Sequence, residues 1–331
     1  MFKDLSKKIR VGICGASGYT GLALIKILIN HPHAEIKFLG ANSSAGQYID
    51  DIFPELSPFS MKCEEFENIS LVDIDLVFFA TPNGFCERYS KELIERDIYV
   101  IDLSADHRFD DNCVYGLVEI FREEIIEKSK DACIIANPGC YTTSGILALA
   151  PILSSIPDAV DDHIIIDGKS GISGAGRKAE TRIIFTELNE NLSPYNLGGK
   201  HRHRPEFNRI LSKIAHKQIN VNFAPHLIPM SFGLLTTSYL KLIKNISIVE
   251  IRKIFNEYYE DEIFIKILDE NTYPNTKWAL KSNNAFLHLC KDESTNTLII
   301  SSAIDNIYKG ASSQAVQNMN LVFELAENTG L

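Results

Sequence analysis

The 331-residue chain has no C-x-x-C pair and no apolar run near the roughly 20 residues that a membrane span needs. Its seven cysteines are an odd number, and the N-terminal stretch MFKDLSKKIR is polar rather than an apolar leader. These features argue against a secreted disulfide scaffold and favour free thiols in a reducing compartment. We therefore expect a cytoplasmic protein without membrane spans.

The chain also lacks an excess of positive charge, because its formal net charge is −10. This balance argues against non-specific binding to nucleic acid or anionic lipid. An anionic small molecule would need a local cluster of cationic side chains. The length exceeds the usual size of one hydrophobic core, so two domains are expected.

The N-terminal part shows short apolar runs that alternate with helical patterns. The run 9–14 ends at the glycine-rich stretch GASGYTG (15–21), and LALIKILINH (22–31) follows with helical spacing. Further strands are expected at 35–41, 75–81, 99–105 and 132–138, and a helix at 86–97. Strands of this kind between helices predict a parallel, doubly wound α/β sheet of the Rossmann type.

After about residue 160 the pattern changes. Strands are expected at 163–167, 234–242, 285–290 and 297–303, and several of them alternate polar with apolar residues. Such alternation is typical of a mixed or antiparallel sheet that is covered on one face. Segments 248–259 and 312–327 have the pattern of amphipathic helices.

The glycine turn indicates a dinucleotide site. Gly15, Gly18 and Gly21 lie between a strand and a helix, where glycine allows a tight turn and a close approach to a pyrophosphate. The second strand is followed by Ala41, Asn42, Ser43 and Ser44, with no acidic residue to hold a ribose 2′-hydroxyl. Hydroxyl groups there can accept a 2′-phosphate, so NADP is the expected cofactor.

Cys140 is the candidate nucleophile. NPG (137–139) breaks a strand, and TTSGILALAPIL (142–153) is expected to be helical, so the cysteine lies near a helix N-terminus. The helix dipole lowers the pKa of a thiol at this position, and backbone N–H groups can stabilise an oxyanion. Cys133, inside an expected strand, is interpreted as a core residue.

A thiol nucleophile needs a base, and GGKHRHRPEF (198–207) offers His201 and His203. These histidines alternate with Lys200, Arg202 and Arg204, a basic cluster that suits a phosphate or carboxylate, although a solvated basic loop is the alternative. SGISGAGR (170–177) is a second candidate for anion binding. A thiol beside a hydride carrier predicts interconversion of an aldehyde and an acyl phosphate through a thioester.

At this point the chain resembles the N-acetyl-gamma-glutamyl-phosphate reductase family of arginine biosynthesis. The stretches that carry the resemblance include GASGYTG (15–21), VIDLSADHR (100–108), ANPGCYTT (136–143), SGISGAGR (170–177), HRHRPEF (201–207), PHLIPM (225–230) and SAIDNIYKGASSQAVQNMN (302–320). The related aspartate-semialdehyde dehydrogenases share the architecture but match these stretches poorly.

The resemblance implies NADPH-dependent reduction of N-acetyl-L-glutamyl 5-phosphate to the 5-semialdehyde, with Cys140 as nucleophile and His203, rather than His201, as the favoured acid/base. It implies an NADP-binding domain at 1–140 plus 311–331 and an inserted catalytic and oligomerisation domain at 141–310, in a dimer or tetramer. The substrate-binding residues that it implies are Ser173, Arg177, Tyr195, Arg202 and Glu206. The cofactor-binding residues that it implies are Gly15, Ser17, Gly18, Tyr19, Thr20, Gly21, Ser43, Ser44, Thr81, Pro82, Ser104, Gly174, Asn306 and Lys309.

The chain departs from the family at Phe232, where an arginine is usual, and at Asn83, where a histidine is common. The segment between Arg108 and Val114 is also shorter than usual. Two alternatives are a paralogous reductase that acts on a carrier-bound aminoadipyl phosphate in lysine synthesis and a catalytically silent dinucleotide sensor. The intact Cys140 and histidines weigh against the sensor.

Overall fold

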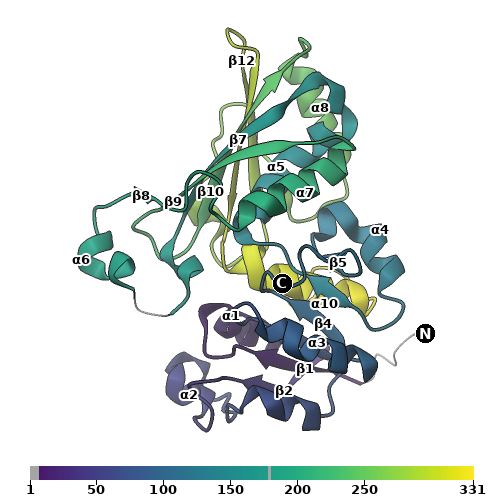
Figure 1. Cartoon of the computed structure of the whole chain (residues 1–331), viewed down its shortest axis with the longest axis vertical. Coiled ribbons are helices and arrows are strands. Elements are labelled where there is room, and N and C mark those ends of the chain that lie inside the picture. The colour runs from purple at the N-terminus through teal and green to yellow at the C-terminus, as the bar shows by residue number, and fades with distance from the viewer. Residues whose placement is uncertain (1–6, 178–179) are drawn as a thin grey trace. The chain divides into compact units, whose positions relative to one another are not determined.

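The computed structural model describes residues 7–177 and 180–331, and the chain divides into two units. The first unit contains residues 1–139 and 311–331, and the second contains residues 140–310. Figure 1 labels most of the helices and strands of both units. None of the helices in the described part of the chain combines the length and the apolar character that a membrane span requires.

The first unit is built on a parallel sheet of six strands in the order β2-β1-β3-β4-β6-β5. Its strands are β1 (Ile9–Cys14), β2 (Ala34–Gly40), β3 (Leu76–Phe79), β4 (Tyr99–Asp102), β5 (Val114–Tyr115) and β6 (Ile134–Ala136). Its helices are α1 (Tyr19–Leu28), α2 (Ile49–Ile52), α3 (Phe85–Glu95), α4 (Val118–Lys128) and α10 (Ser313–Val322). The parallel α/β sheet predicted from the alternating pattern is confirmed.

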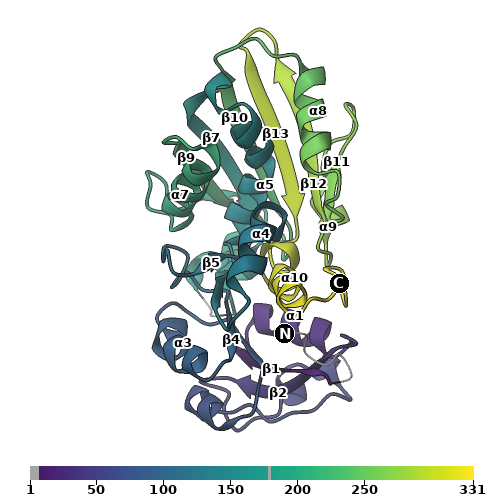
Figure 2. The same ribbon diagram turned by 90° about the vertical axis from the view of Figure 1, so that its right-hand side faces the viewer.

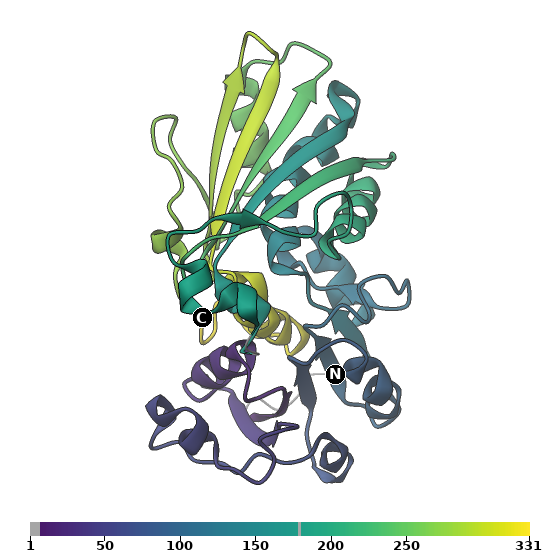
Figure 3. The ribbon, with the colours of Figure 1, turned by 60° about the vertical axis from the view of Figure 1, so that its left-hand side comes forward.

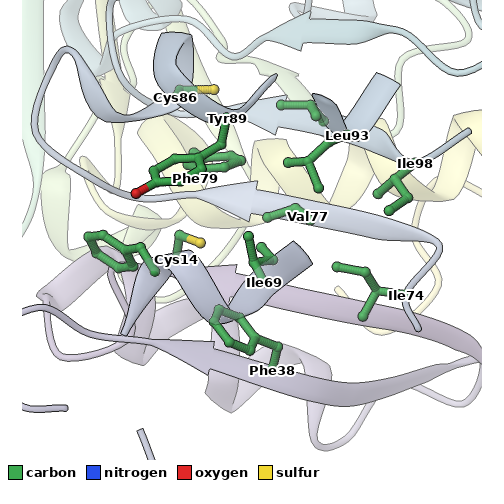
Figure 4. Packing of buried hydrophobic residues seen from close by; sticks show 12 residues of the cluster. Cys14, Phe38, Ile69, Ile74, Val77, Phe79, Cys86, Tyr89, Leu93 and Ile98 are labelled. Atoms are coloured by element: carbon green, nitrogen blue, oxygen red, sulfur yellow. The ribbon is translucent and has the colours of Figure 1, made fainter. Parts of the chain in front are cut away.

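The core of this unit explains why the strands are so apolar. Phe38, Val77 and Phe79 are almost completely buried and belong to one apolar cluster with Leu93 of α3 and with Ile69, which precedes β3 (Figure 4). A strand buried on both faces has no room for polar side chains, so its sequence is a continuous apolar run rather than an alternating one. The C-terminal helix α10 belongs to this unit and contacts α1, α4 and β4.

The second unit contains a mixed sheet of seven strands in the order β11-β12-β13-β10-β7-β9-β8. Its strands are β7 (Val160–Ser170), β8 (Ser193–Pro194), β9 (Asn220–Leu227), β10 (Leu234–Leu242), β11 (Ile265–Ile267), β12 (Ala285–Asp292) and β13 (Thr297–Ile304). Pairs β7–β9 and β11–β12 are parallel, and the other neighbours are antiparallel. The expected mixed sheet is therefore present.

Helices cover one face of this sheet. They are α5 (Cys140–Ser155), α7 (His203–Ala215) and α8 (Ile248–Tyr258), and the unit also has the short helices α6 (Phe185–Leu188) and α9 (Thr276–Ala279). Figure 2 labels α5, α7 and α8 and the strands that they contact, and Figure 3 shows these strands in front of the helices. Along β7 and β10 buried residues alternate with more exposed ones, and Ile165 on the open face is 48% exposed.

Candidate active site

The cofactor candidates of the first unit follow the carboxyl ends of four parallel strands. The glycine turn follows β1, Ser43 and Ser44 follow β2, Thr81 and Pro82 follow β3, and Ser104 follows β4. Carboxyl ends of parallel strands lie at one edge of a sheet, and ligands bind at the edge where the strand order reverses. Here β1 lies between β2 and β3, so the reversal falls at the glycine turn.

The turn after β1 requires its glycines. Gly15 has φ +90°, and a Cβ there would lie 2.2 Å from the carbonyl oxygen of Ala80. A Cβ at Gly21 would lie 2.3 Å from the carbonyl oxygen of Gly15. The N-cap of α1 is Gly18, which has no side chain to cap the first turn of the helix. The N-terminus of such a helix favours an anion such as a pyrophosphate.

Two neighbouring groups at the same edge fit a polar ligand. The hydroxyl Oγ1 of Thr81 is buried and has no hydrogen-bond partner within the described part of the chain. Ser104 is held by Asp102, whose carboxylate accepts a 2.8 Å hydrogen bond from the Ser104 N–H. A buried polar atom without a partner is costly, and a bound ligand with a donor or acceptor would relieve that cost.

In the second unit Cys140 is the first residue of α5. The position after NPG therefore places the thiol at the positive end of a 16-residue helix, as the sequence predicts. A π-helical turn at Tyr308–Ser312 passes close to it. A Cβ on Gly310 would lie 2.7 Å from the Cβ of Cys140, so glycine is required for this approach.

Helix α7 brings the histidines to the start of α5. The hydroxyl of Thr142 donates a 2.7 Å hydrogen bond to the buried carboxylate of Glu206, which joins the first turns of the two helices. Farther along, a Cβ on Gly145 would lie 2.6 Å from the ring of Phe207, so the absence of a side chain there lets the helices pack closely. Cys140 and the histidines consequently share one pocket.

That pocket has a volume of about 330 Å³. Its lining residues are Cys140, Tyr141, Ser170, Gly171, Gly174, Ala175, Arg182, Tyr195, Asn196, Lys200, His201, Arg202, His203 and Leu227. Three cationic side chains and no carboxylate are among these residues of the described chain, although the protein is acidic overall. The pocket therefore favours an anionic ligand.

The two histidines are buried, which is contrary to the alternative of a solvated basic loop. His201 Nδ1 accepts a 3.1 Å hydrogen bond from the backbone N–H of His203, so in the neutral ring the proton is on Nε2. Burial, with the nearby charge of Arg202, lowers the pKa of His201 to about 4. His201 is therefore neutral near pH 7, and the ring centroid of His203 lies 4.7 Å from its own.

Two tyrosines complete the wall beside the nucleophile. The hydroxyl of the buried Tyr141 donates a 3.0 Å hydrogen bond to the carbonyl of His226. Tyr195 follows β8, and its N–H donates to the carbonyl of Pro225 at 3.1 Å, so the pairing of β8 with β9 holds it at the pocket. Burial raises the pKa of Tyr195 to about 12, so its hydroxyl keeps its proton and can donate a hydrogen bond.

Of the other residues implied by the resemblance, Gly174 is in the lining of the pocket and Asn306, Lys309 and Arg177 are not. Asn306 accepts from the N–H of Gly233 at 2.8 Å and donates to the hydroxyl of Ser173 at 2.9 Å. Lys309 is buried, with its Nζ 5.6 Å from the ring centroid of Phe264. Arg177 is exposed, and Gly174 lines the pocket.

Sequence reasoning did not single out Tyr141, Arg182 or Asn196 as site residues. Tyr141 directly follows the nucleophile, which was the available signal. Arg182 and Asn196 belong to a long excursion between β7 and α7 that contains little regular structure. Phe232, in place of the family's usual arginine, is 37% exposed and does not line the pocket.

Comparisons with known proteins identify both parts of the chain. A family model described as semialdehyde dehydrogenase, NAD binding domain, matches residues 10–128, and one described as semialdehyde dehydrogenase, dimerisation domain, matches residues 140–306. A protein from Campylobacter jejuni subsp. jejuni serotype O:2, named N-acetyl-gamma-glutamyl-phosphate reductase, is 42% identical over 98% of each chain. A Pseudothermotoga lettingae protein of the same name is 43% identical, again over 98% of each chain.

Solved structures share the fold. The aspartate semialdehyde dehydrogenase II of Vibrio cholerae, complexed with ASA, has a TM-score of 0.78 at 19% identity and covers 96% of this chain and 99% of its own. An aspartate semialdehyde dehydrogenase with NADP from Candida albicans has a TM-score of 0.74 at 17% identity, with coverage of 96% and 99%. At such identities the likeness is one of fold.

Proposed function

The chain belongs to the N-acetyl-gamma-glutamyl-phosphate reductase family, and on that premise we propose how its residues catalyse the family's reaction in arginine biosynthesis. The reaction is the NADPH-dependent reduction of N-acetyl-L-glutamyl 5-phosphate to N-acetyl-L-glutamate 5-semialdehyde and phosphate. The observation that carries the proposal is the shared, cation-rich pocket of Cys140 and His203. The names of the relatives favour this substrate over the aminoadipyl phosphate of lysine synthesis.

Cys140 is the proposed nucleophile. Its thiolate attacks the acyl carbon, a sulfur–carbon bond forms, and the carbon–oxygen bond to phosphate breaks, which leaves a thioester on the protein. Lys200 and Arg202 at the pocket offset the charge of the departing phosphate. NADPH, when bound, supplies the hydride that reduces the thioester to a thiohemiacetal.

His203 is the proposed acid and base. As an imidazolium it protonates the oxygen of the thiohemiacetal as that group forms, and as a neutral ring it takes the proton back when the carbon–sulfur bond breaks and the aldehyde leaves. His201 is less suited to this role because its pKa of about 4 leaves too little imidazolium near pH 7. Its backbone-bonded Nδ1 supports a positioning role.

The first unit fits NADP(H). Gly15, Gly18 and Gly21 would hold the pyrophosphate, Thr81 would bond to the cofactor through its buried hydroxyl, and Ser43 with Ser44 would face a 2′-phosphate. The orphaned Thr81 hydroxyl and the turn that excludes a Cβ support this assignment. We accordingly propose residues 1–140 with 311–331 as the NADP-binding domain and residues 141–310 as the catalytic domain.

We further propose a homo-oligomer in which the open sheet face of the catalytic domain is covered by another copy. The match to a dimerisation-domain model over residues 140–306 supports this, as does the exposed Ile165 on that face. Seven cysteines as free thiols support a reducing compartment such as the cytoplasm. Sedimentation velocity would test the assembly, and a strictly monomeric enzyme at full activity would exclude it.

A spectrophotometric assay in reverse tests the function. NADP, phosphate and N-acetyl-L-glutamate 5-semialdehyde should generate reduced cofactor, and the signal should require phosphate. Cys140→Ser should abolish turnover and leave NADPH affinity within about twofold of wild type, since none of the contacts proposed for the pyrophosphate, for the 2′-phosphate or at Thr81 involves the thiol. Full turnover by this variant would refute the nucleophile assignment.

The histidine assignment is tested by paired variants. His203→Gln should lower kcat by about 10²–10⁴-fold and remove one limb of the pH–rate profile, because a positioned acid contributes about that much. His201→Gln should lower kcat less and keep both limbs. The reverse ranking, or a pH profile that only His201→Gln changes, would transfer the role to His201.

A further inference from the structure

The pocket has one cationic side chain, Arg182, besides the two that we assign to the departing phosphate. Arg182, Lys200 and Arg202 line it, and no carboxylate does so among the described residues. The proposed substrate has two anionic groups, the acyl phosphate at C5 and the carboxylate at C1. Lys200 and Arg202 flank His201 in the chain, which places their backbone next to the acid/base residues. Arg182 comes from a different segment.

Arg182 contacts the ring of Tyr195, which also lines the pocket. Its guanidinium carbon lies 5.7 Å from the centroid of the Tyr195 ring, within the range of a cation–π contact. The Tyr195 centroid lies 5.4 Å from that of His201, which in turn contacts His203. Two rings therefore separate Arg182 from the proposed acid/base.

The ion pair that Arg182 forms with Glu180 is weak enough for a ligand to replace it. The Nε of Arg182 donates a 2.9 Å hydrogen bond to Glu180, and the side chains of the two residues are 51% and 44% exposed. An ion pair this exposed contributes little, because water screens it and two long side chains lose freedom. A substrate carboxylate can replace Glu180 as the acceptor at small cost.

We infer that Arg182 binds the C1 carboxylate of the substrate and thereby selects for substrates that have this carboxylate; this inference rests on the function proposed above. Four carbon–carbon bonds of about 1.5 Å separate C5 from C1, so both ends of the substrate span only about 5 Å and fit one pocket. A guanidinium can hold a carboxylate by two parallel hydrogen bonds, a geometry that lysine does not offer.

The test compares two aldehydes in the reverse reaction. N-acetyl-L-glutamate 5-semialdehyde has the carboxylate, and 4-acetamidobutanal is the same molecule without it. Arg182→Gln should lower kcat/KM for the acidic aldehyde by about 10- to 100-fold, the range of a lost charge-assisted hydrogen bond. It should leave kcat/KM for 4-acetamidobutanal and the KM for phosphate within about twofold of wild type.

Two further variants distinguish a role of Arg182 in binding the carboxylate from a role in stabilising the fold. Arg182→Lys should lose part of the discrimination, because it keeps the charge without the two-pronged geometry. Arg96→Gln is the matched control: Arg96 also forms a surface ion pair, with Glu92, but does not line the pocket. It should leave all the constants unchanged. Thermal unfolding of each variant checks that the comparison uses folded enzyme, and Arg182→Lys carries the test if Arg182→Gln does not fold.

Each other outcome overturns the inference. Equal losses with both aldehydes would make Arg182 structural, and a raised KM for phosphate would assign it to the phosphate end. Unchanged discrimination in Arg182→Gln would remove it from substrate binding, with the proposed function intact. Wild-type inactivity toward the acidic aldehyde would instead refute the proposed function, and the inference with it.

Discussion

Replacing Gly310 with alanine should displace the nucleophile. The added methyl carbon would lie 2.7 Å from the Cβ of Cys140, which is 0.7 Å closer than the 3.4 Å at which ordinary contact begins. The neighbour is the base of a short side chain on a buried helix, so the backbone has to move. Misplacing a reacting group by about 1 Å can cost about 10²-fold in rate. We therefore expect kcat to fall by about 10- to 100-fold.

The assay is the reverse reaction, together with the rate at which iodoacetamide alkylates Cys140. Overpacking should also lower the free energy of unfolding by about 1–3 kcal/mol. Gly12→Ala is the control, because its Cβ would meet neighbours at 3.4 Å or more and it lies in β1, outside the proposed site. A Gly310→Ala enzyme with kcat within twofold of wild type would refute the reasoning.

Three further predictions concern other parts of the molecule. Gly15→Ala should weaken NADPH binding at least about 10-fold in a fluorescence titration. The φ of Gly15 is +90°, and an added Cβ would lie 2.2 Å from a backbone carbonyl oxygen, so the turn that we assign to the cofactor has to move; unchanged affinity would contradict that assignment. Gly145→Ala should lower both the unfolding midpoint and kcat, because it separates α5 from α7; a drop in stability alone would show that helix spacing does not set the site. Burial opposes ionisation of Asp102 and His107, yet their mutual hydrogen bond lowers the pKa of Asp102 and raises that of His107. The pair should therefore stabilise the fold between those two pKa values and lose effect as pH falls through the first or rises through the second; His107→Gln should flatten this dependence in urea titrations, and an unchanged pH profile would exclude it.

Elements with a clean local pattern could be predicted from the sequence. The strand expected at 234–242 is β10, Leu234–Leu242, along which buried residues alternate with half-buried or exposed ones. The expected helix 312–327 is shorter, Ser313–Val322, and follows a π-helical turn. Its buried polar residues, such as Gln314 and Asn318, bond to the carbonyl of Gly116, a partner that no local pattern reveals.

Other elements gave no local signal. Strand β9, Asn220–Leu227, contains Pro225 and polar residues, which argue against a strand when read alone. It forms because its whole length pairs with β7 in a parallel ladder whose register stays regular past Pro225, which lies opposite Gly168. Helix α7 begins at His203, inside the stretch 198–207 for which a solvated basic loop was the alternative, and Glu206 in its first turn accepts a hydrogen bond from Thr142 of another helix.

For the active site, the residue types and the secondary structure around each of them could be predicted from the sequence. A strand, a break and a helix predict Cys140 at a helix start, and that setting follows from short-range backbone preferences. Which side chains surround the thiol depended on packing between segments 63 positions apart in the chain. The closeness of Gly145 to Phe207, the bond between Thr142 and Glu206, and the approach of Gly310 are long-range contacts, and such contacts exist only after the chain has folded.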